Sequence, residues 1–240
     1  MSFQKLSVVI PVYNEEKTVK DVLRAVVDVH LLNSLSKEII IVDDGSTDDT
    51  VNSVKDFISS TSDSDIRLIE HGKNQGKGGA LHTGFAQATG DLIIVQDADM
   101  EYDPEEFNIL LKPMLKGFAD VVYGSRFMGG SAHRILFFWH SIGNKWLTFF
   151  SNMTTNLNLS DMETCYKLFR ADILKGLSLS EKQFGFEPEV TAKVSNIPDV
   201  RIYEVGISYN GRTYAEGKKI NWKDGFQAIW CIFKYGVLKA

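Results

Sequence analysis

The chain has 240 residues, a mass of 27.0 kDa and a net charge of −5 at neutral pH. Hydrophobic residues make up 44% of it and charged residues 24%, a globular composition that excludes a disordered, collagen-like or coiled-coil chain. The acidic charge argues against a nucleic-acid-binding protein, and the length fits one large domain, or one domain with a small appendage.

The first half of the chain alternates short apolar runs with segments of helical periodicity. We expect strands at 6–12, 38–42, 66–70, 92–95 and 119–123. We expect helices at 17–29, 48–59 and 78–88, the second with Ser46 or Thr47 as its N-cap. Such alternation is typical of βαβ units, so the sequence predicts an α/β fold with a mostly parallel sheet.

Polar clusters follow four of the expected strands. They are Tyr13-Asn14-Glu15-Glu16, Asp43-Asp44-Gly45-Ser46, Asp97-Ala98-Asp99 and Gly124-Ser125-Arg126. Ligands of open α/β sheets bind beyond the carboxyl ends of the strands. We therefore expect the four clusters to converge on one cleft.

The segment Asp97-Ala98-Asp99 is a candidate metal site. Alternate residues of an extended segment point the same way, so Asp97 and Asp99 can face one cation, with Glu101 one step further. Mg²⁺ and Mn²⁺ prefer oxygen ligands, and Mg²⁺ commonly combines carboxylates with substrate phosphates. The alternative is a solvated acidic loop.

Two other clusters allow contact with a nucleotide. An aspartate of the segment 43–46 can bind ribose hydroxyls or a base edge, or the segment can form only a turn and a helix cap. Tyr13 can lie against a base with Glu15 at its polar edge, unless Glu15 and Glu16 only favour the start of the next helix.

The glycine-rich segment 72–79 suggests a phosphate loop but lacks the spacing of a P-loop. No dinucleotide-binding glycine motif follows the first strand, and no G-x-S-x-G motif is present. These absences disfavour an ATPase, an NAD enzyme and an α/β-hydrolase. The glycines either let the backbone approach a nucleotide or only begin a helix.

The second half of the chain is more basic and carries two amphipathic segments. In 134–150, apolar residues recur on one helical face: Ile135, Phe138, Trp139, Ile142, Trp146, Phe149 and Phe150. The segment 221–240 repeats this pattern. Aromatic residues on one face and basic residues on the other suit a helix at a membrane interface. A helix that packs into the core is the alternative.

The cysteines and the apolar runs indicate in which cellular compartment the protein lies and whether it spans a membrane. Two cysteines, Cys165 and Cys231, are too few for a disulfide framework, so we expect reduced thiols in a cytosolic protein. The first residues lack the apolar core of a signal peptide. The best candidates for a membrane span, 135–150 and 226–238, are interrupted by polar residues, so we expect no transmembrane helix.

Five motifs, taken together and in this order, resemble a known family. They are PVYNEE at 11–16, VDDGSTD at 42–48, GKGGAL at 76–81, GDLIIVQDAD at 90–99 and YGSRF at 123–127. They resemble family 2 glycosyltransferases of the GT-A fold, especially the dolichol-phosphate mannose synthases and their bacterial polyprenyl-phosphate relatives. The resemblance covers residues 6–220.

The resemblance implies a Rossmann-like GT-A domain at 1–220, with a mostly parallel sheet flanked by helices. Residues 1–124 would bind the nucleotide-sugar and residues 125–220 the acceptor, followed by an amphipathic C-terminal segment at 221–240. The segment 161–167 departs from the family's pattern, so the identity of the transferred sugar stays open.

The resemblance also implies site residues. Those for the nucleotide-sugar are Pro11, Tyr13, Glu15, Val42, Asp44, Asp97, Ala98, Asp99, Arg212 and Lys218. Mg²⁺ or Mn²⁺ would bind at Asp97, Asp99 and Glu101. The candidates for catalysis are Asp99, Arg126 and Asp161, and those for the acceptor phosphate are Arg126, Arg134, His140 and Ser141.

The implied function is a metal-dependent, inverting transfer of a hexose from a GDP-mannose-type or UDP-glucose-type donor to a polyprenyl or dolichyl phosphate. A phosphate acceptor is already ionised and needs no general base, whereas a saccharide hydroxyl, the alternative acceptor, needs one, such as Asp161. A non-catalytic nucleotide-sugar-binding module is a further alternative. We expect a peripheral enzyme at the cytoplasmic face of the membrane, held there directly or by a membrane-anchored partner protein.

Overall fold

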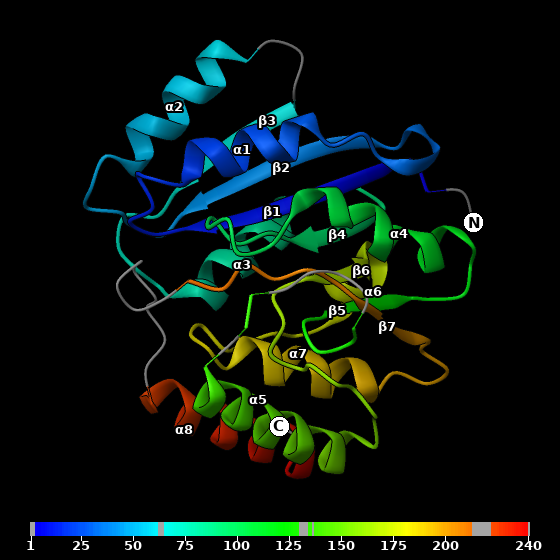
Figure 1. Cartoon of the computed structure of the whole chain (residues 1–240). Coiled ribbons are helices and arrows are strands. Elements are labelled where there is room, and N and C mark those ends of the chain that lie inside the picture. Colours follow the sequence, from blue (N-terminus) through cyan, green and yellow to red (C-terminus); the bar gives the residue numbers. More distant parts are fainter. Residues whose placement is uncertain (1–2, 62–64, 130–133, 136, 213–221, 240) are drawn as a thin grey trace.

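A computed structural model of the chain describes residues 3–61, 65–129, 134–135, 137–212 and 222–239. Its sheet has the strand order β3-β2-β1-β4-β6-β5-β7 (Figure 1). The strands are β1 Lys5–Val12, β2 Ser36–Asp43, β3 Asp65–Glu70, β4 Leu92–Val95, β5 Val121–Ser125, β6 Lys167–Arg170 and β7 Ile202–Gly206. Neighbouring strands run parallel except at β6, which is antiparallel to β4 and β5. The α/β fold with a mostly parallel sheet is confirmed.

The helices lie on both faces of this sheet, with α1 and α4 on one face and α3 and α7 on the other (Figure 1). They are α1 Val19–Asp28, α2 Thr50–Ser60, α3 Lys77–Gln87, α4 Phe107–Leu115, α5 Phe138–Thr155, α6 Ala171–Gly176, α7 Phe186–Ser195 and α8 Trp222–Cys231. A π-helical turn, Ile232–Val237, continues α8. Helices α5 and α8 form an outer layer beyond α7 (Figure 1).

Local sequence accounts for these elements. Strands β1, β2 and β4 are runs of valine, isoleucine and leucine buried on both faces, as parallel strands covered by two helical layers should be. Helix α1 buries Val19, Val22, Leu23 and Val26, whose spacing places them on one helical face. The predicted cap of α2 was wrong, because the Ser46 hydroxyl instead accepts a hydrogen bond from the backbone N–H of Asn14.

A buried carboxylate ties together the amino ends of the strands, at the edge opposite the strand-end clusters. Glu38 has no exposed surface, and its oxygens accept hydrogen bonds from the Ser7 hydroxyl, Thr89 and the backbone of Gly90. Arg67 also donates to it. Burial by itself would raise the pKa of Glu38, but the hydrogen bonds outweigh it and lower that pKa to about 2.

Candidate active site

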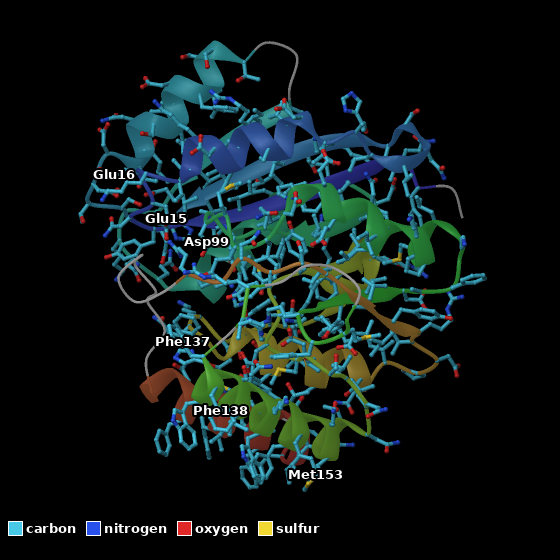
Figure 2. All side chains as sticks on the ribbon, in the orientation of Figure 1. Glu15, Glu16, Asp99, Phe137, Phe138 and Met153 are labelled. Carbon is cyan, nitrogen blue, oxygen red and sulfur yellow. The ribbon has the colours of Figure 1, made fainter. Side chains whose placement is uncertain are left out.

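A pocket of about 390 Å³ opens at the carboxyl ends of β1, β2 and β4. Figure 2 shows Glu15 and Asp99 together at this edge of the sheet. The pocket is lined by Pro11, Val12, Tyr13, Glu15, Asp44, Asn74, Gly76, Lys77, Ala80, Asp97, Ala98, Asp99, Glu101, Gln183, Phe184 and Arg212. Three of the four polar clusters therefore meet here, whereas Arg126, from the fourth, is not among the lining residues.

Asp44 organises the floor of the pocket. Its carboxylate accepts hydrogen bonds from the backbone N–H groups of Gln75, at 2.9 Å, and Gly76, at 2.7 Å, and lies 2.8 Å from the ring of His71. Gly45 has a φ of +77°, and a Cβ there would lie 2.9 Å from a backbone nitrogen of the glycine-rich segment. The strand-end turn and the glycine-rich segment are thus built against each other.

Three acidic side chains surround the guanidinium of Arg212. Asp99 accepts a hydrogen bond from it, Glu15 lies 3.4 Å from it, and Glu101 lies 3.5 Å from its Nε. Glu101 also accepts hydrogen bonds from the backbone N–H of Arg212 and from the Tyr209 hydroxyl. Arg212, which lies far along the chain, therefore neutralises carboxylates from the ends of β1 and β4.

Lys77 is a pocket residue that the sequence reasoning missed. Its ammonium group lies 2.9 Å from Asp97 and 3.4 Å from Glu187 of α7. Burial would lower the pKa of Lys77, but Asp97 and Glu187 raise it well above its ordinary value, so the side chain is a cation. The sequence feature that could have identified Lys77 as a pocket residue is its position in the glycine-rich segment 72–79.

The donor set fits a hard divalent cation in its chemistry. Burial, followed by the neighbouring carboxylates of Asp97 and Glu101, raises the pKa of Asp99 to about 7, although Arg212 acts in the opposite direction. Among the described residues, no group of three or more His, Cys, Asp or Glu side chains is arranged to hold a metal. Two carboxylates with oxygens of a bound diphosphate are the arrangement that Mg²⁺ commonly uses.

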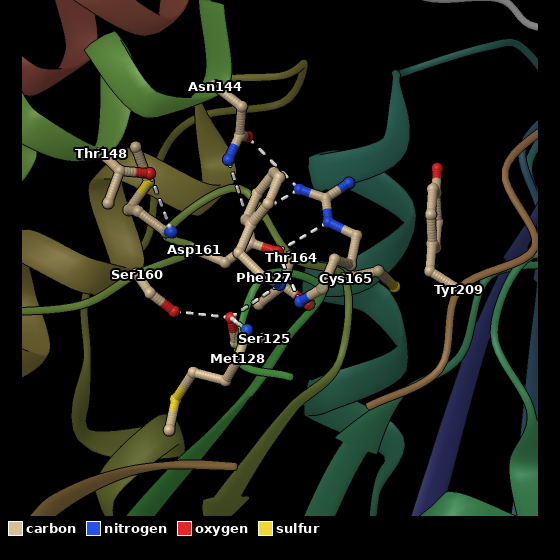
Figure 3. A network of polar contacts seen from close by, with 12 residues as sticks. Ser125, Phe127, Met128, Asn144, Thr148, Ser160, Asp161, Thr164, Cys165 and Tyr209 are labelled. Carbon is tan, nitrogen blue, oxygen red and sulfur yellow. Dashed lines mark hydrogen bonds and ion pairs between the residues drawn. The ribbon is translucent and has the colours of Figure 1, made fainter. Parts of the chain in front are cut away.

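Arg126 lies beside the pocket in a buried ion pair. Its Nε and one terminal nitrogen donate to the two oxygens of Asp161 at 2.6 and 2.7 Å, a two-pronged geometry that fixes the guanidinium. Figure 3 shows Asn144 reaching from α5 toward Asp161, and its amide donates to Asp161 at 3.0 Å. Asp161 has no exposed surface, and the backbone N–H of Arg126 also donates to it.

The other predicted acceptor residues lie near the start of α5. Arg134 donates to the carbonyl of Gly211, directly before Arg212. His140 packs near Phe137, and the Ser141 hydroxyl donates to the Phe137 carbonyl.

Two further residues were predicted to bind the donor. Val42 is fully buried in β2 and is not among the lining residues of the pocket. Lys218 lies outside the described residues.

Helix α5 turns polar residues toward the protein and aromatic residues toward the solvent. Thr148 and Ser151 are 4% and 2% exposed, whereas Trp139 and Trp146 are 77% and 54% exposed. A helix that packs into the core would show the reverse, so the core-packing alternative was wrong. The exposed apolar side chains on α5, α8 and the π-helical turn, here called the aromatic surface, are Phe138, Trp139, Trp146, Phe149, Phe150, Met153, Phe226, Ile229, Trp230, Phe233 and Val237.

The described part of the chain has no helix that is both long and apolar enough to span a membrane. Cys165 and Cys231 are buried and unpaired with each other.

A family profile and two curated proteins are similar to this chain. The sequence profile described as "Glycosyl transferase family 2" matches residues 7–177. Dodecaprenyl-phosphate galacturonate synthase of Rhizobium johnstonii is 27% identical over 214 residues, which cover 89% of this chain and 61% of that protein. Dolichol-phosphate mannosyltransferase of Pyrococcus furiosus is 26% identical over 220 residues, which cover 90% and 60%. The chain thus spans less than two thirds of the length of these relatives.

A solved structure shows the same fold. Glucosyl-3-phosphoglycerate synthase of Mycobacterium tuberculosis, in complex with Mn²⁺, UDP and glucosyl-3-phosphoglycerate, superimposes with a TM-score of 0.75 at 19% identity. The match covers 97% of this chain and 80% of that one. The fold is therefore GT-A, and because the profile covers most of the sequence, the chain belongs to glycosyl transferase family 2.

Proposed function

We propose that this protein transfers a hexose from a nucleotide-sugar to a polyprenyl phosphate at a membrane surface. The observation that carries the proposal is the pocket at the strand ends, in which Asp97, Asp99, Glu101 and Arg212 converge. Both curated relatives are named for sugar transfer to a polyprenyl or dolichyl phosphate. The aromatic surface adds a place where a lipid bilayer can be contacted.

The pocket residues have distinct tasks in this proposal. Tyr13 and Glu15 line the part of the pocket at the end of β1 and hold the nucleoside, while Asp44 keeps the glycine-rich floor in place. Asp97, Asp99 and Glu101 would hold Mg²⁺ or Mn²⁺, which when bound stabilises negative charge on the leaving diphosphate.

Two cations of the chain stabilise the same leaving group. Lys77 and Arg212 line the pocket as partly buried positive charges next to the aspartates. Positive groups already aimed at developing negative charge need no rearrangement during the reaction, which lowers the barrier. Lys218 is assigned to this task by its place in the family's motif and lies outside the described residues.

Arg126 positions the acceptor phosphate. Its guanidinium lies 5.2 Å from the centre of the Tyr209 ring, and the Tyr209 hydroxyl donates to Glu101 of the donor pocket. Tyr209 therefore contacts both the acceptor-binding arginine and the donor pocket. The phosphate oxygen is already ionised and attacks the anomeric carbon without a base, with inversion. Asp161 is buried and bound to Arg126, so its role is to orient Arg126 rather than to remove a proton from a saccharide hydroxyl.

The aromatic surface would let the protein bind a membrane by itself. Lys145 is exposed on the same helix as Trp139 and Trp146, which suits contact with anionic lipid. The relatives' names give no support for a separate membrane-anchored partner protein. Unpaired, buried Cys165 and Cys231 are compatible with the cytoplasmic face.

The test is a donor and acceptor panel. The protein is incubated with Mn²⁺ or Mg²⁺ and with GDP- and UDP-sugars, with and without a short polyprenyl phosphate, and released nucleoside diphosphate is measured. Release that depends on the lipid phosphate supports the proposal. Release only with saccharide acceptors, or tight donor binding without any release, would refute it.

A further inference from the structure

The loop 180–185 forms one wall of the pocket and leaves no free space against α3. Gln183 and Phe184 line the pocket. The Gly79 N–H donates to the carbonyl of Lys182 at 3.2 Å. A Cβ on Gly76 would lie only 2.2 Å from that same carbonyl oxygen. The position of this loop therefore sets the shape of the pocket.

The same loop is bound to the C-terminal helix. One oxygen of the Glu181 carboxylate accepts hydrogen bonds from Lys234 at 2.8 Å and from the Tyr235 hydroxyl at 2.7 Å. The Tyr235 hydroxyl also lies 2.8 Å from the hydroxyl of Ser180. Two residues of the π-helical turn thus hold two consecutive residues of the loop.

These contacts are tightly packed and charged. Tyr235 is buried, with the ammonium group of Lys234 lying 4.5 Å from its ring centre. Burial by itself would raise the pKa of Glu181, but the hydrogen bonds from Lys234 and Tyr235 lower it below its ordinary value. A Cβ on Gly185 would lie 2.5 Å from the sulfur of Cys231, so the helix also touches the end of the loop.

The opposite face of this helix belongs to the aromatic surface. Phe233 is exposed, whereas Ile232, directly before it, and Tyr235, two residues after it, are buried. The element that presents apolar side chains to the outside therefore also holds the wall of the donor pocket on its inner side.

On the basis of the proposed function, we infer that Glu181, Lys234 and Tyr235 are positioning residues for the nucleotide-sugar donor. They keep the Gln183–Phe184 wall in place through the Glu181 carboxylate, and they touch neither the reacting atoms nor the aspartates that would hold the metal. Their loss should weaken donor binding without slowing the chemical step, because the groups that stabilise the leaving diphosphate stay in place.

The test compares variants of the full chain. Tyr235→Phe removes the hydroxyl and keeps the ring, Lys234→Met removes the charge, and Lys234→Arg keeps it. Tyr203→Phe, at an exposed position of β7, is the matched control. The dissociation constants of UDP and GDP with Mn²⁺ are measured by calorimetry, thermal melting checks the fold, and kcat and KM are measured with the sugar donor that the panel identifies.

We expect Tyr235→Phe and Lys234→Met to raise the dissociation constant and the KM about fivefold, the effect of losing one net hydrogen bond, with kcat unchanged. Lys234→Arg should restore most of the affinity, and Tyr203→Phe should change nothing. If the wild type binds UDP or GDP and folded Tyr235→Phe and Lys234→Met bind it equally well, the positioning role is wrong. If the wild type binds neither nucleotide, the proposed function itself fails.

Discussion

Replacing Trp139 and Trp146 together by alanine should release the protein from lipid vesicles while leaving it folded. The two side chains are 77% and 54% exposed, so they contribute little to packing inside the protein. Their rings belong to the aromatic surface, and Trp146 stacks on Phe150 with ring centres 5.8 Å apart.

The expected loss follows from the exposed area. A tryptophan side chain presents up to about 250 Å², so the two exposed fractions amount to roughly 320 Å² of surface. If about half of that surface leaves water when the helix lies in the interface, at about 25 cal/mol per Å², the two rings supply about 4 kcal/mol. Alanine retains a small part of this, so the loss is about 3 kcal/mol, or more than 100-fold in partitioning.

The assay is flotation with anionic vesicles over a range of lipid concentrations, together with a thermal melt. Phe118→Ala is the matched control, since Phe118 is an exposed aromatic residue in the turn after α4 and outside the aromatic surface. A folded double variant that floats like the wild type would show that this surface does not contact lipid. An equal loss in Phe118→Ala would show that the binding is not specific to the surface.

Four further substitutions test the interior and the site. Glu38→Gln should cost about 2–4 kcal/mol in urea denaturation at pH 7. Because the Glu38 pKa is lowered to about 2, its stabilisation is present above pH 4.5 and is lost as the pH falls toward 2, so the difference between variant and wild type should shrink at pH 3. Asp99→Asn should lower lipid-dependent turnover by roughly 100-fold or more and weaken Mn²⁺-dependent calorimetric binding of nucleoside diphosphate, and unchanged binding would argue against a metal at this residue. Arg126→Lys and Asp161→Asn should each lower kcat by roughly 10- to 100-fold, since a lysine cannot form the two-pronged pair, and the double variant should be little worse than either single one. Additive losses in that double-mutant cycle would contradict the role of Asp161 in orienting Arg126.

The first half of the fold could be predicted from local sequence because its signals are short-range. The strand at 92–95 was predicted with the same bounds that β4 has, and β1, β2 and β3 differ from their predicted ranges by only a few residues. Buried parallel strands must be runs of valine, isoleucine and leucine, and the helices between them must show an apolar stripe. Strands β6 and β7 were not predicted, since antiparallel insertion of a four-residue segment is decided by its neighbours in the sheet.

The site was predicted in part. The aspartates at 97 and 99 lie in the pocket because the ends of parallel strands meet at one edge of a sheet. Gln183 and Phe184 were missed, since nothing in their local sequence marks a ligand and the fold alone brings their loop against the start of α3. The resemblance implied that Arg212 binds the donor, and the structure adds its contacts with Asp99, Glu15 and Glu101.

The sequence by itself determined the mostly parallel character of the sheet, the order of elements in the first half and the acidic residues at the sheet edge, because backbone alternation and side-chain polarity act over a few residues. Only the tertiary structure decided that α5 turns its aromatic side chains outward and its threonine and serine inward. A helical period shows which residues share a face but not which face meets the protein. That choice depends on α7 and α8, which lie further along the chain and pack against α5.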